Sequence, residues 1–420
     1  MHVKTIVCVL SVFLCASIAR AQTPGEGLTW EDCLTEARRN HPDLVSAFEK
    51  VNQNKADKDI VRSNALPQVS ADLDASTGKT TGHSQADSYS YGATARQLLF
   101  DGFKTSNDLA AARANINAAL YDYDVTSSNI RLRLRTAFID LLEAQELLKV
   151  SQNIAERRKK NVDMINLRYE GGREHRGSLF KEQANFAQAQ FNVEQALRGI
   201  ELSQRRLSKE LGREQFVPVT AVGQLEVVDF DMAKPDFEDM VNTVPFLKEL
   251  AARKEAAKWG VKSARSDFFP QIYANADAGK SDVHWPPRPN TWSAGLSVTF
   301  PLFEGGAQQA QLSKARAAFK QSQADQRSGR DGMVLTLAET WTDWQDNVAL
   351  IAVQKKFLDA STERARIAEA QYSSGLISFN DWTIIEDDLV RNQNAFLQAR
   401  ANAMVSQADW AQAKGETLDE

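Results

Sequence analysis

The chain contains an internal duplication, because segments 203 residues apart match each other with no insertion between them. The matching motifs keep their order along the chain: Leu66-Pro67-Gln68 with Phe269-Pro270-Gln271, Leu99-Phe100-Asp101-Gly102 with Leu302-Phe303-Glu304-Gly305, and Tyr169 and Gly172 with Tyr372 and Gly375. The repeated unit spans about 170 residues or more, far beyond the 20–50 residues of a solenoid repeat. We therefore expect two quasi-equivalent halves that fold into the same structural unit and share the function.

Residues 1–21 have the composition of a secretory signal peptide. Lys4 is followed by an apolar run from Ile6 to Ile18, and Ala19-Arg20-Ala21 supplies the small residues of a cleavage site. The run is about 13 residues long, whereas a membrane-spanning helix needs about 20. We expect cleavage after Ala21 and export of the mature protein.

The mature chain retains one cysteine and a mild negative charge. Cleavage removes Cys8 and Cys15 and leaves Cys33, so no internal disulfide is expected. The whole chain carries a formal charge of −5, which becomes −7 when Lys4 and Arg20 are removed. The mean hydropathy is −0.42, and no later apolar stretch approaches the length of a transmembrane helix. Because an acidic exported chain is a poor nucleic-acid binder, we predict no nucleic-acid partner.

The sequence contains no recognisable catalytic or cofactor-binding motif. The histidines are dispersed, and no two have the spacing of an HExxH metal site; they are His2, His41, His83, His175 and His284. Neighbouring acids such as Asp387 and Asp388 fall on a predicted helix, where adjacent side chains diverge. No GxGxxG, P-loop or GxSxG sequence is present. We therefore predict that the protein is not an enzyme and holds neither a cofactor nor a metal.

Turn residues and changes of hydrophobic period divide each half into the same series of elements. A helix opens at Thr29, an N-cap with acids in the following turn, and a second helix runs from about Pro42 to Ala65. A strand hairpin follows, then a long helix, a short turn and a return helix that ends at a glycine. We predict a signal peptide at 1–21, a first repeat at 22–212, a connecting segment at 213–234, a second repeat at 235–415 and a short tail at 416–420. In the first repeat the strand hairpin lies at about 67–99 and the turn between the helices at 170–177. In the second repeat the strand hairpin lies at about 270–302 and the turn at 373–379.

The predicted strands alternate between apolar and polar side chains. After Pro67 and Pro270 the hydrophobic period changes from helical to two, over segments of roughly 10 residues, the length of a tilted membrane strand. Aromatic residues gather at both ends of the strands, as in the interfacial girdles of a membrane barrel. The polar face, which would meet water in a barrel lumen, includes Asp72, Asp74, Arg96, Asn275 and Asp277.

This alternation has two interpretations. An amphipathic hairpin packed on a soluble core would show the same pattern. In lipid, the four strands of one chain cannot close a barrel, and open sheet edges are not tolerated there. A membrane location therefore requires several chains to share one barrel.

The longest helices contain too little bulky apolar sequence to form a globular core. The stretch from Thr105 to Arg168 lacks Pro and Gly, and as one helix it would be roughly 95 Å long. The return helix of the first half has the 4-3 spacing typical of a coiled coil, at Phe186, Val193, Leu197, Ile200, Leu207 and Leu211. Such a helix pair either stands alone as a long hairpin or packs side by side with other pairs.

Several motifs, in their order along both halves, resemble those of the TolC-type outer membrane efflux proteins. They are the helix opening LTWEDCLTEARRNHP, the strand entry ALPQVSADLDAS, LLFDG and PLFEGG after the second strands, and the turns RYEGG and QYSSGLISFNDW. The resemblance implies an α+β membrane protein that forms a homotrimer. Its twelve-stranded β-barrel in outer-membrane lipid, with four strands from each chain, would continue into a trimeric α-barrel in the periplasm. Short segments such as Thr29–Arg39 and Pro235–Asn242 would form an equatorial layer.

The same resemblance implies passive conduction of a substrate. An inner-membrane pump of the RND or ABC type would pass the substrate through a periplasmic adaptor (membrane fusion) protein and this channel to the exterior of a Gram-negative bacterium. Drug efflux, small-molecule efflux and type I protein secretion remain open, and dispersed methionines do not favour copper or silver export. The alternative is a periplasmic coiled-coil structural or adaptor protein, which leaves the amphipathic strands unexplained.

The resemblance also places a periplasmic gate and an adaptor-docking site at the helical turns. The family pattern is Tyr-x-x-Gly followed by an Asp six residues after the glycine. The second half matches it at Tyr372, Gly375 and Asp381. The equivalent residues of the first half are Tyr169, Gly172 and Ser178. Ser178 replaces an Asp, and Ile377 stands where the family often has an Arg. The gate of the family is therefore not carried over whole.

Charge distinguishes the two turns. The first turn is basic, with Arg168, Arg173, His175, Arg176 and Lys181, and the second is followed by acids, at Asp381, Glu386, Asp387 and Asp388. We expect Arg173 or Arg176 to pair with Asp381 between neighbouring hairpins and to hold the entrance closed. If these charges are only solvated surface groups, each contributes about 0–1 kcal/mol to the stability of the closed entrance.

Overall fold

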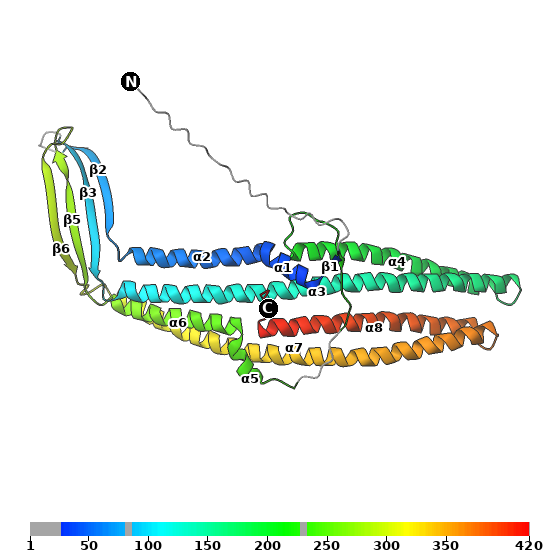
Figure 1. Ribbon diagram of the computed structural model, residues 1–420. Coiled ribbons are helices and arrows are strands. Elements are labelled where there is room, and N and C mark those ends of the chain that lie inside the picture. The colour runs from blue at the N-terminus through cyan, green and yellow to red at the C-terminus, as the bar shows by residue number, and fades with distance from the viewer. Residues whose placement is uncertain (1–26, 80–85, 227–232, 420) are drawn as a thin grey trace, which may run out of the picture.

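A long rod of helices carries a curved sheet at one end (Figure 1). The computed structural model describes residues 27–79, 86–226 and 233–419. The predicted signal peptide and its cleavage site lie outside these ranges. The last helix runs back from the far end of the rod and ends at its mid-length (Figure 1). We call this middle part of the rod the waist.

Two helical hairpins contain most of the chain, and they repeat each other. The long helices α3 (Lys104–Glu170) and α7 (Ala307–Ser373) have 67 residues each. The return helices are α4 (Arg176–Glu210) and α8 (Phe379–Lys414). A helix of 67 residues is about 100 Å long. The absence of Pro and Gly from α3 explains why it continues unbroken.

Shorter helices lie at the waist and between the waist and the sheet. α2 (Pro42–Ser63) and α6 (Pro245–Ser266) lead to the sheet, and α1 (Trp30–Asn40), α5 (Phe237–Met240) and the 3₁₀ turn Val241–Thr243 lie at mid-length. Thr29 caps α1 as predicted. Its Oγ1 accepts the amide of Asp32 at 3.3 Å, and Asp32 Oδ2 accepts the amide of Thr29 at 3.0 Å.

Four antiparallel strands form the sheet in the order β2-β3-β5-β6. Their bounds are Gln68–Gly78 for β2, Ala86–Phe100 for β3, Gln271–Asp282 for β5 and Asn290–Thr299 for β6. The two strand hairpins join through β3 and β5, so β2 and β6 are the edges of the sheet in one chain. A second, two-stranded parallel sheet at the waist pairs β1 (Gly27–Leu28) with β4 (Thr220–Ala221).

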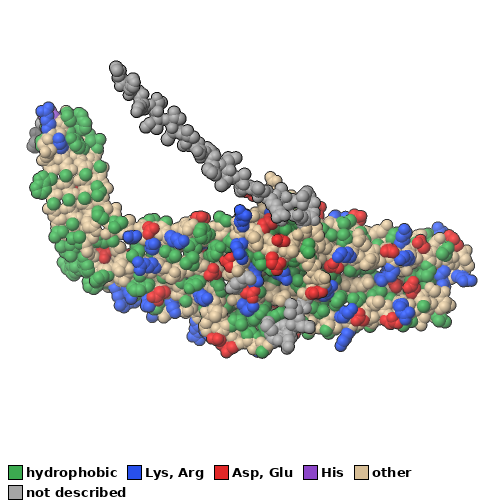
Figure 2. Space-filling model, in the orientation of Figure 1, with side chains coloured by type: hydrophobic (Ala, Val, Ile, Leu, Met, Phe, Trp, Pro, Cys, Tyr) green, Lys and Arg blue, Asp and Glu red, His purple; other side chains and the backbone are tan. Residues whose placement is uncertain are grey.

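The apolar core is concentrated in three clusters along the rod. The largest joins α1, α3, α8 and the connecting segment around Leu134. A second lies where α7 and α8 meet α5, around Trp410, and a third lies near the hairpin turns, around Trp382. Charged side chains are scattered over the helical rod among apolar and uncharged ones, whereas the visible face of the sheet between its ends carries mainly apolar and uncharged groups (Figure 2).

The return helix α4 packs only in part through the bulky seam predicted above. Leu207 and Leu211 are buried, but Leu197 is 45% exposed. Buried positions recur every seven residues along α4, at Glu182, Ala189, Ala196, Ser203 and Glu210. The heptad period is as predicted, and Leu207 and Leu211 are buried at predicted positions. Earlier in the helix the buried position is one residue before the predicted one, at Ala196 in place of Leu197, where a small side chain allows the two helices of the hairpin to approach closely.

The predicted combination of duplicated helical hairpins and four strands per chain is confirmed. Within the described ranges, no helix is both long enough and apolar enough to cross a membrane. The long hairpins place their turns at the end of the rod opposite the sheet (Figure 1). The hairpin turns and the sheet, to which the sequence assigns the gate and the lumen, therefore lie at opposite ends of the rod.

Candidate functional site at the hairpin turns and the strand face

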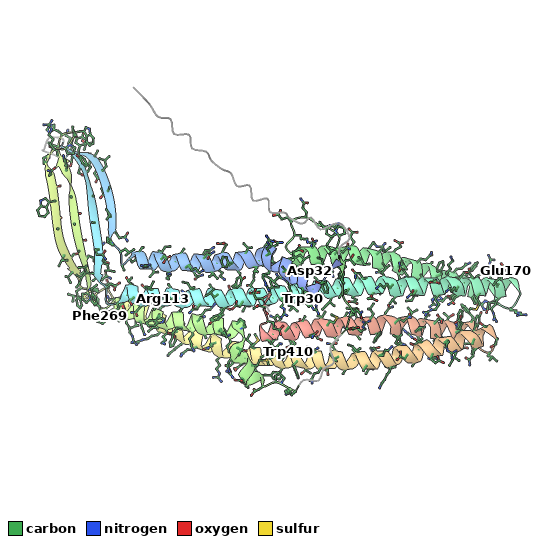
Figure 3. The ribbon with its side chains drawn as sticks, in the orientation of Figure 1. Trp30, Asp32, Arg113, Glu170, Phe269 and Trp410 are labelled. Carbon is green, nitrogen blue, oxygen red and sulfur yellow. The ribbon has the colours of Figure 1, made fainter. Side chains whose placement is uncertain are left out.

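Both hairpin turns have the same backbone structure. Gly172 adopts φ +69°, its amide donates to the carbonyl of Tyr169 at 3.0 Å, and the amide of Arg173 donates to the carbonyl of Arg168 at 2.8 Å. The second turn repeats these bonds, with Gly375 at φ +81°. This arrangement is the Schellman motif, whose left-handed position favours glycine. Glu170 marks the first turn at the far end of the rod (Figure 3).

An arginine and a tyrosine join the two turns. Arg168 Nη1 donates to the carbonyl oxygens of Tyr372 and Ser373, both at 3.1 Å. The same guanidinium lies 4.6 Å from the centroid of the Tyr372 ring. Tyr372 is 2% exposed and stacks on Trp382, with ring centroids 4.7 Å apart. A side chain of the second hairpin is therefore held by the first.

Glu174 accepts the hydroxyl of Tyr372. The phenolic oxygen donates to Glu174 Oε2 at 2.6 Å, and Glu174 Oε1 accepts Ser178 Oγ at 2.9 Å and the amide of His175 at 3.1 Å. Burial raises the pKa of Glu174, but these hydrogen bonds outweigh burial and hold the pKa below its usual value. Burial and the bond to Glu174 both raise the pKa of Tyr372. At neutral pH the pair is therefore a carboxylate and a neutral phenol.

A cluster of ion pairs lies deeper between the hairpins. Arg158, which is 5% exposed, contacts Glu182 of α4 at 3.5 Å and Asp387 of α8. Arg157 contacts Glu386 of α8 at 3.1 Å. Burial raises the pKa of Glu386 despite the nearby arginines. The acids of this cluster face arginines, and in the described ranges no group of three or more His, Cys, Asp and Glu side chains is placed to hold a metal ion.

The residues predicted for the gate come together only in part. Gly172 and Gly375 form the turns, and Tyr372 lies in the contact between hairpins. Its counterpart Tyr169 is 39% exposed. Ser178 reaches the contact by donating to Glu174.

The predicted pairing of Arg173 or Arg176 with Asp381 does not occur within one chain over the described residues. Asp381 is instead held by the N-cap of its own helix: its amide donates to Oγ of the cap residue Ser378 at 3.2 Å, and its carboxylate accepts that hydroxyl at 2.7 Å. The Arg176 guanidinium lies 4.8 Å from the centroid of the Phe180 ring. A pairing between neighbouring chains stays a prediction.

Several residues that complete the contact between the hairpins were not predicted from the sequence, among them Glu174, Trp382, Arg157, Arg158 and Glu182. For Glu174 the missing signal is a comparison of the two halves. Glu174 in the first half corresponds to Ile377 in the second half, so the two halves differ in charge at this position. For the ion-pair cluster we find no comparable signal, because its members are spread over three helices.

The sheet divides its side chains between a polar and an apolar face. All five predicted lumen residues have polar or glycine neighbours in register: Asp72 with Gly92, Asp74 with Ser90, Arg96 with Gln68 and Asn275, and Asp277 with Thr94 and Ser293. Two hydrogen bonds connect this face, from Asn275 Nδ2 to Ser297 Oγ at 3.0 Å and from Ser293 Oγ to Asp277 Oδ2 at 2.9 Å. Arg96 lies 3.7 Å from the centroid of the Tyr273 ring.

The opposite face of the sheet is apolar and exposed in one chain. Its most exposed side chains are Val69 at 72%, Leu73 at 70%, Trp292 at 80% and Leu296 at 71%. An apolar surface of this kind is not stable in water without a cover. The cover is either lipid or another protein.

A groove lies between α3, α4 and α8, on the length of rod between the waist and the turns. Its volume is about 440 Å³. Small and apolar residues predominate in its lining, including Ala144, Leu147, Ile154, Ala189, Ala196 and Val390. Ala144 of α3 and Ala189, Ala196 and Gly199 of α4 supply the small residues of this lining.

Comparison with known proteins gives a family match over most of the chain. The model of the family described as Outer membrane efflux protein matches residues 33–213 and 241–416, one segment in each half of the duplication. The chain is 20% identical over 383 residues to the outer membrane efflux protein BepC of Brucella suis biovar 1 (strain 1330), with 90% of this chain and 83% of that protein covered. It is 23% identical over 415 residues to the outer membrane protein TolC of Escherichia coli (strain K12), with 92% and 80% covered.

A solved structure shows the same fold. The CmeC outer membrane channel of Campylobacter jejuni matches with a TM-score of 0.83 at 17% sequence identity. The match covers 92% of this chain and 85% of that chain. The likeness therefore extends over the rod and the sheet together.

Proposed function

The chain belongs to the outer membrane efflux protein family, and from this membership we propose that it is the channel of a tripartite export system. It is located in the outer membrane and extends into the periplasm. Substrate would reach it from an inner-membrane pump, of the RND or ABC type, through a periplasmic adaptor protein. The observation that carries the proposal is the sheet, whose exposed apolar face stands at the end of helices about 100 Å long. A periplasmic coiled-coil protein would have no use for such a sheet.

The open sheet supports a homotrimer. β2 and β6 are edges in one chain, and open edges are not tolerated in lipid. Closed assemblies of identical chains use the same pair of surfaces in every copy. Three copies would pair β2 of one chain with β6 of the next and enclose the polar face as a lumen.

The groove between α3, α4 and α8 supports docking of the adaptor. Its small and apolar lining suits an amphipathic helix laid along the rod. The groove is formed within one chain, so each subunit would offer one such site. The prediction that the turns also take part in docking is retained, since they lie at the same end of the rod.

The contact among Arg168, Tyr372 and Glu174 supports a gate at the turns. It joins one hairpin to the other by hydrogen bonds from Arg168 to two carbonyls and from Tyr372 to a carboxylate. Hydrogen bonds to charged groups contribute about 1.5–3 kcal/mol each. Holding the two hairpins together would keep the periplasmic entrance narrow, and separating them would widen it.

We expect Tyr372→Phe to weaken the gate and leave the fold intact. The substitution removes the hydroxyl that binds Glu174 but keeps the ring that stacks on Trp382. Single-channel recordings of the purified protein in planar bilayers should show a larger conductance than the wild type. Tyr169→Phe is the matched control, because Tyr169 is exposed and should leave the conductance unchanged. Equal conductance in Tyr372→Phe and the wild type would remove Tyr372 from the gate.

The pairing of Arg173 or Arg176 with Asp381 of a neighbouring chain would add a second lock. Asp381→Lys would reverse the charge at the second turn and repel the basic first turn. If the pairing exists, the conductance should rise; an unchanged conductance excludes this lock and leaves the Tyr372 contact untouched. Asp381→Asn tests the charge separately from the hydrogen bond, since asparagine has no charge but keeps a side-chain oxygen that can accept the Ser378 hydroxyl.

The channel proposal is tested by deletion of the gene in its native host. The deletion strain should lose export of the substrate and become sensitive to at least one dye, detergent or antibiotic, or stop secreting a polypeptide. The wild-type gene should restore the phenotype, and the protein should be found in the outer-membrane fraction. A protein found as a soluble monomer in the periplasm would contradict the proposal.

A further inference from the structure

A cavity at the waist is separate from the turns, the groove and the strand face. Its volume is about 280 Å³, and it lies where α1, α3 and α8 meet. Trp30 and Trp410, which line it, lie at mid-length, far from Glu170 at the turn (Figure 3). The lining combines indole rings with cationic side chains: Trp30, Trp344, Trp410, Arg131, Arg135 and Lys414.

Arg135 is the least compensated cation of this cavity. Its guanidinium lies 4.7 Å from the centroid of the Trp30 ring and 6.0 Å from that of Phe138. Over the residues that the structure describes, no carboxylate lies within ion-pair distance of it. Burial lowers the pKa of Arg135, and Arg131 lowers it further, while Glu31 acts in the opposite direction. Because arginine stays protonated in proteins, a partly buried positive charge faces the cavity.

The other charges of the lining leave the cavity net positive. Arg131 and Lys414 both form ion pairs with Glu416, so one carboxylate faces two cations. Glu416 is the single acid in the lining, against three cations. Hydrogen-bonding groups are supplied by Ser128, Gln407 and Gln412. An anion entering the cavity would relieve the repulsion between Arg131 and Arg135.

We propose that this cavity binds a small organic anion, a carboxylate attached to a single planar ring. The guanidinium of Arg135 offers the fork of N–H donors that matches a carboxylate. The tryptophans offer apolar surface for the ring. The volume lies just below the roughly 300–1,000 Å³ of pockets for drug-sized molecules, which limits the ligand to one ring. Because α1, α3 and α8 all line the cavity, the bound anion would connect the N-terminal helix to both hairpins.

The probe for this site is benzoate, titrated calorimetrically into the full mature protein in detergent. The wild type should bind benzoate saturably, with one site per chain. Methyl benzoate, which has the same ring but no charge, should bind at least tenfold more weakly. Arg135→Gln should weaken benzoate binding at least tenfold, and Arg135→Lys should weaken it less, since lysine keeps the charge and loses the fork.

Arg327→Gln is the matched control. Arg327 is 87% exposed and does not line the cavity, so its removal changes the net charge equally and should leave benzoate binding unchanged. If Arg135→Gln does not assemble, Arg135→Lys decides, and wild-type affinity in that variant overturns the proposal. The proposal is also overturned if the wild type binds no benzoate, or if Arg135→Gln binds it as well as the wild type. A further result would also contradict the proposal: the wild type binds no benzoate, and the assemblies of Arg135→Gln dissociate. In that case Arg135 forms an ion pair with a carboxylate of a neighbouring chain and not with a ligand.

Discussion

Single residues break the symmetry of the duplication at the turns. Tyr169 and Tyr372 occupy equivalent positions, yet Tyr169 is exposed and Tyr372 is buried. The acceptor of the Tyr372 hydroxyl is Glu174, and the position equivalent to Glu174 is Ile377. Tyr169 therefore lacks the carboxylate that Tyr372 has. One difference between the halves makes one tyrosine a connector and leaves the other at the surface.

The Glu174 contact predicts a pH dependence of stability. The pKa of Glu174 in the folded protein is below its ordinary value of 4.5, so its contribution is fully present above pH 4.5 and is lost as the pH falls through the folded pKa. Glu174→Gln should therefore lower the free energy of unfolding by about 1–3 kcal/mol at neutral pH and by much less in acid.

Thermal unfolding of the wild type and Glu174→Gln at neutral and acidic pH measures this difference. Glu170→Gln is the control, since Glu170 is exposed and accepts a hydrogen bond from Asn166 of its own helix. The same loss in Glu174→Gln at both pH values would show that the charge of Glu174 is not what stabilises the contact.

Elements end where glycine permits a left-handed backbone, and the surroundings of each glycine differ. Gly172 at φ +69° and Gly212 at φ +74° both follow the end of a helix. A Cβ on Gly172 would have no atom within 4 Å, whereas one on Gly212 would lie 2.5 Å from the carbonyl oxygen of Asn40. The first glycine is needed for its conformation alone, and the second also for the close approach of α1.

We therefore expect the two alanine substitutions to differ in cost. Gly172→Ala should destabilise the protein by about 1–2 kcal/mol, the price of a left-handed alanine. Gly212→Ala should cost about 1–3 kcal/mol more, because backbone atoms must also move. Chemical unfolding of the two variants measures the difference, and equal losses would contradict the steric account.

The strands predict opposite outcomes for two neighbouring substitutions. Leu296 lies on the apolar face and is 71% exposed, whereas Ser297 lies on the polar face and accepts a hydrogen bond from Asn275. Leu296→Lys would place a charge in lipid at a cost of about 2–4 kcal/mol near the midplane. Heat-dependent gel mobility should show impaired assembly for Leu296→Lys alone. Normal assembly of Leu296→Lys, or failure of Ser297→Lys alone, would reverse the assignment of the faces.

For the whole molecule, the sequence predicts the architecture better than the contacts between hairpins. Strand alternation, capping by Thr29 and the turn glycines are local patterns, and each could be located from the sequence. The bond between Tyr372 and Glu174 joins residues 198 positions apart, so no local pattern indicates it. The predicted seam of α4 differs from the structure at Leu197 for a related reason, because the neighbouring Ala196 is buried without an apolar signal of its own.

The central claim is that three chains share one barrel and one tube. Native mass spectrometry of the protein extracted from the outer membrane in mild detergent tests it most directly. We expect one species with the mass of three mature chains, stable until heat or strong detergent separates them. A single chain, or an assembly of any other number of chains, would contradict it.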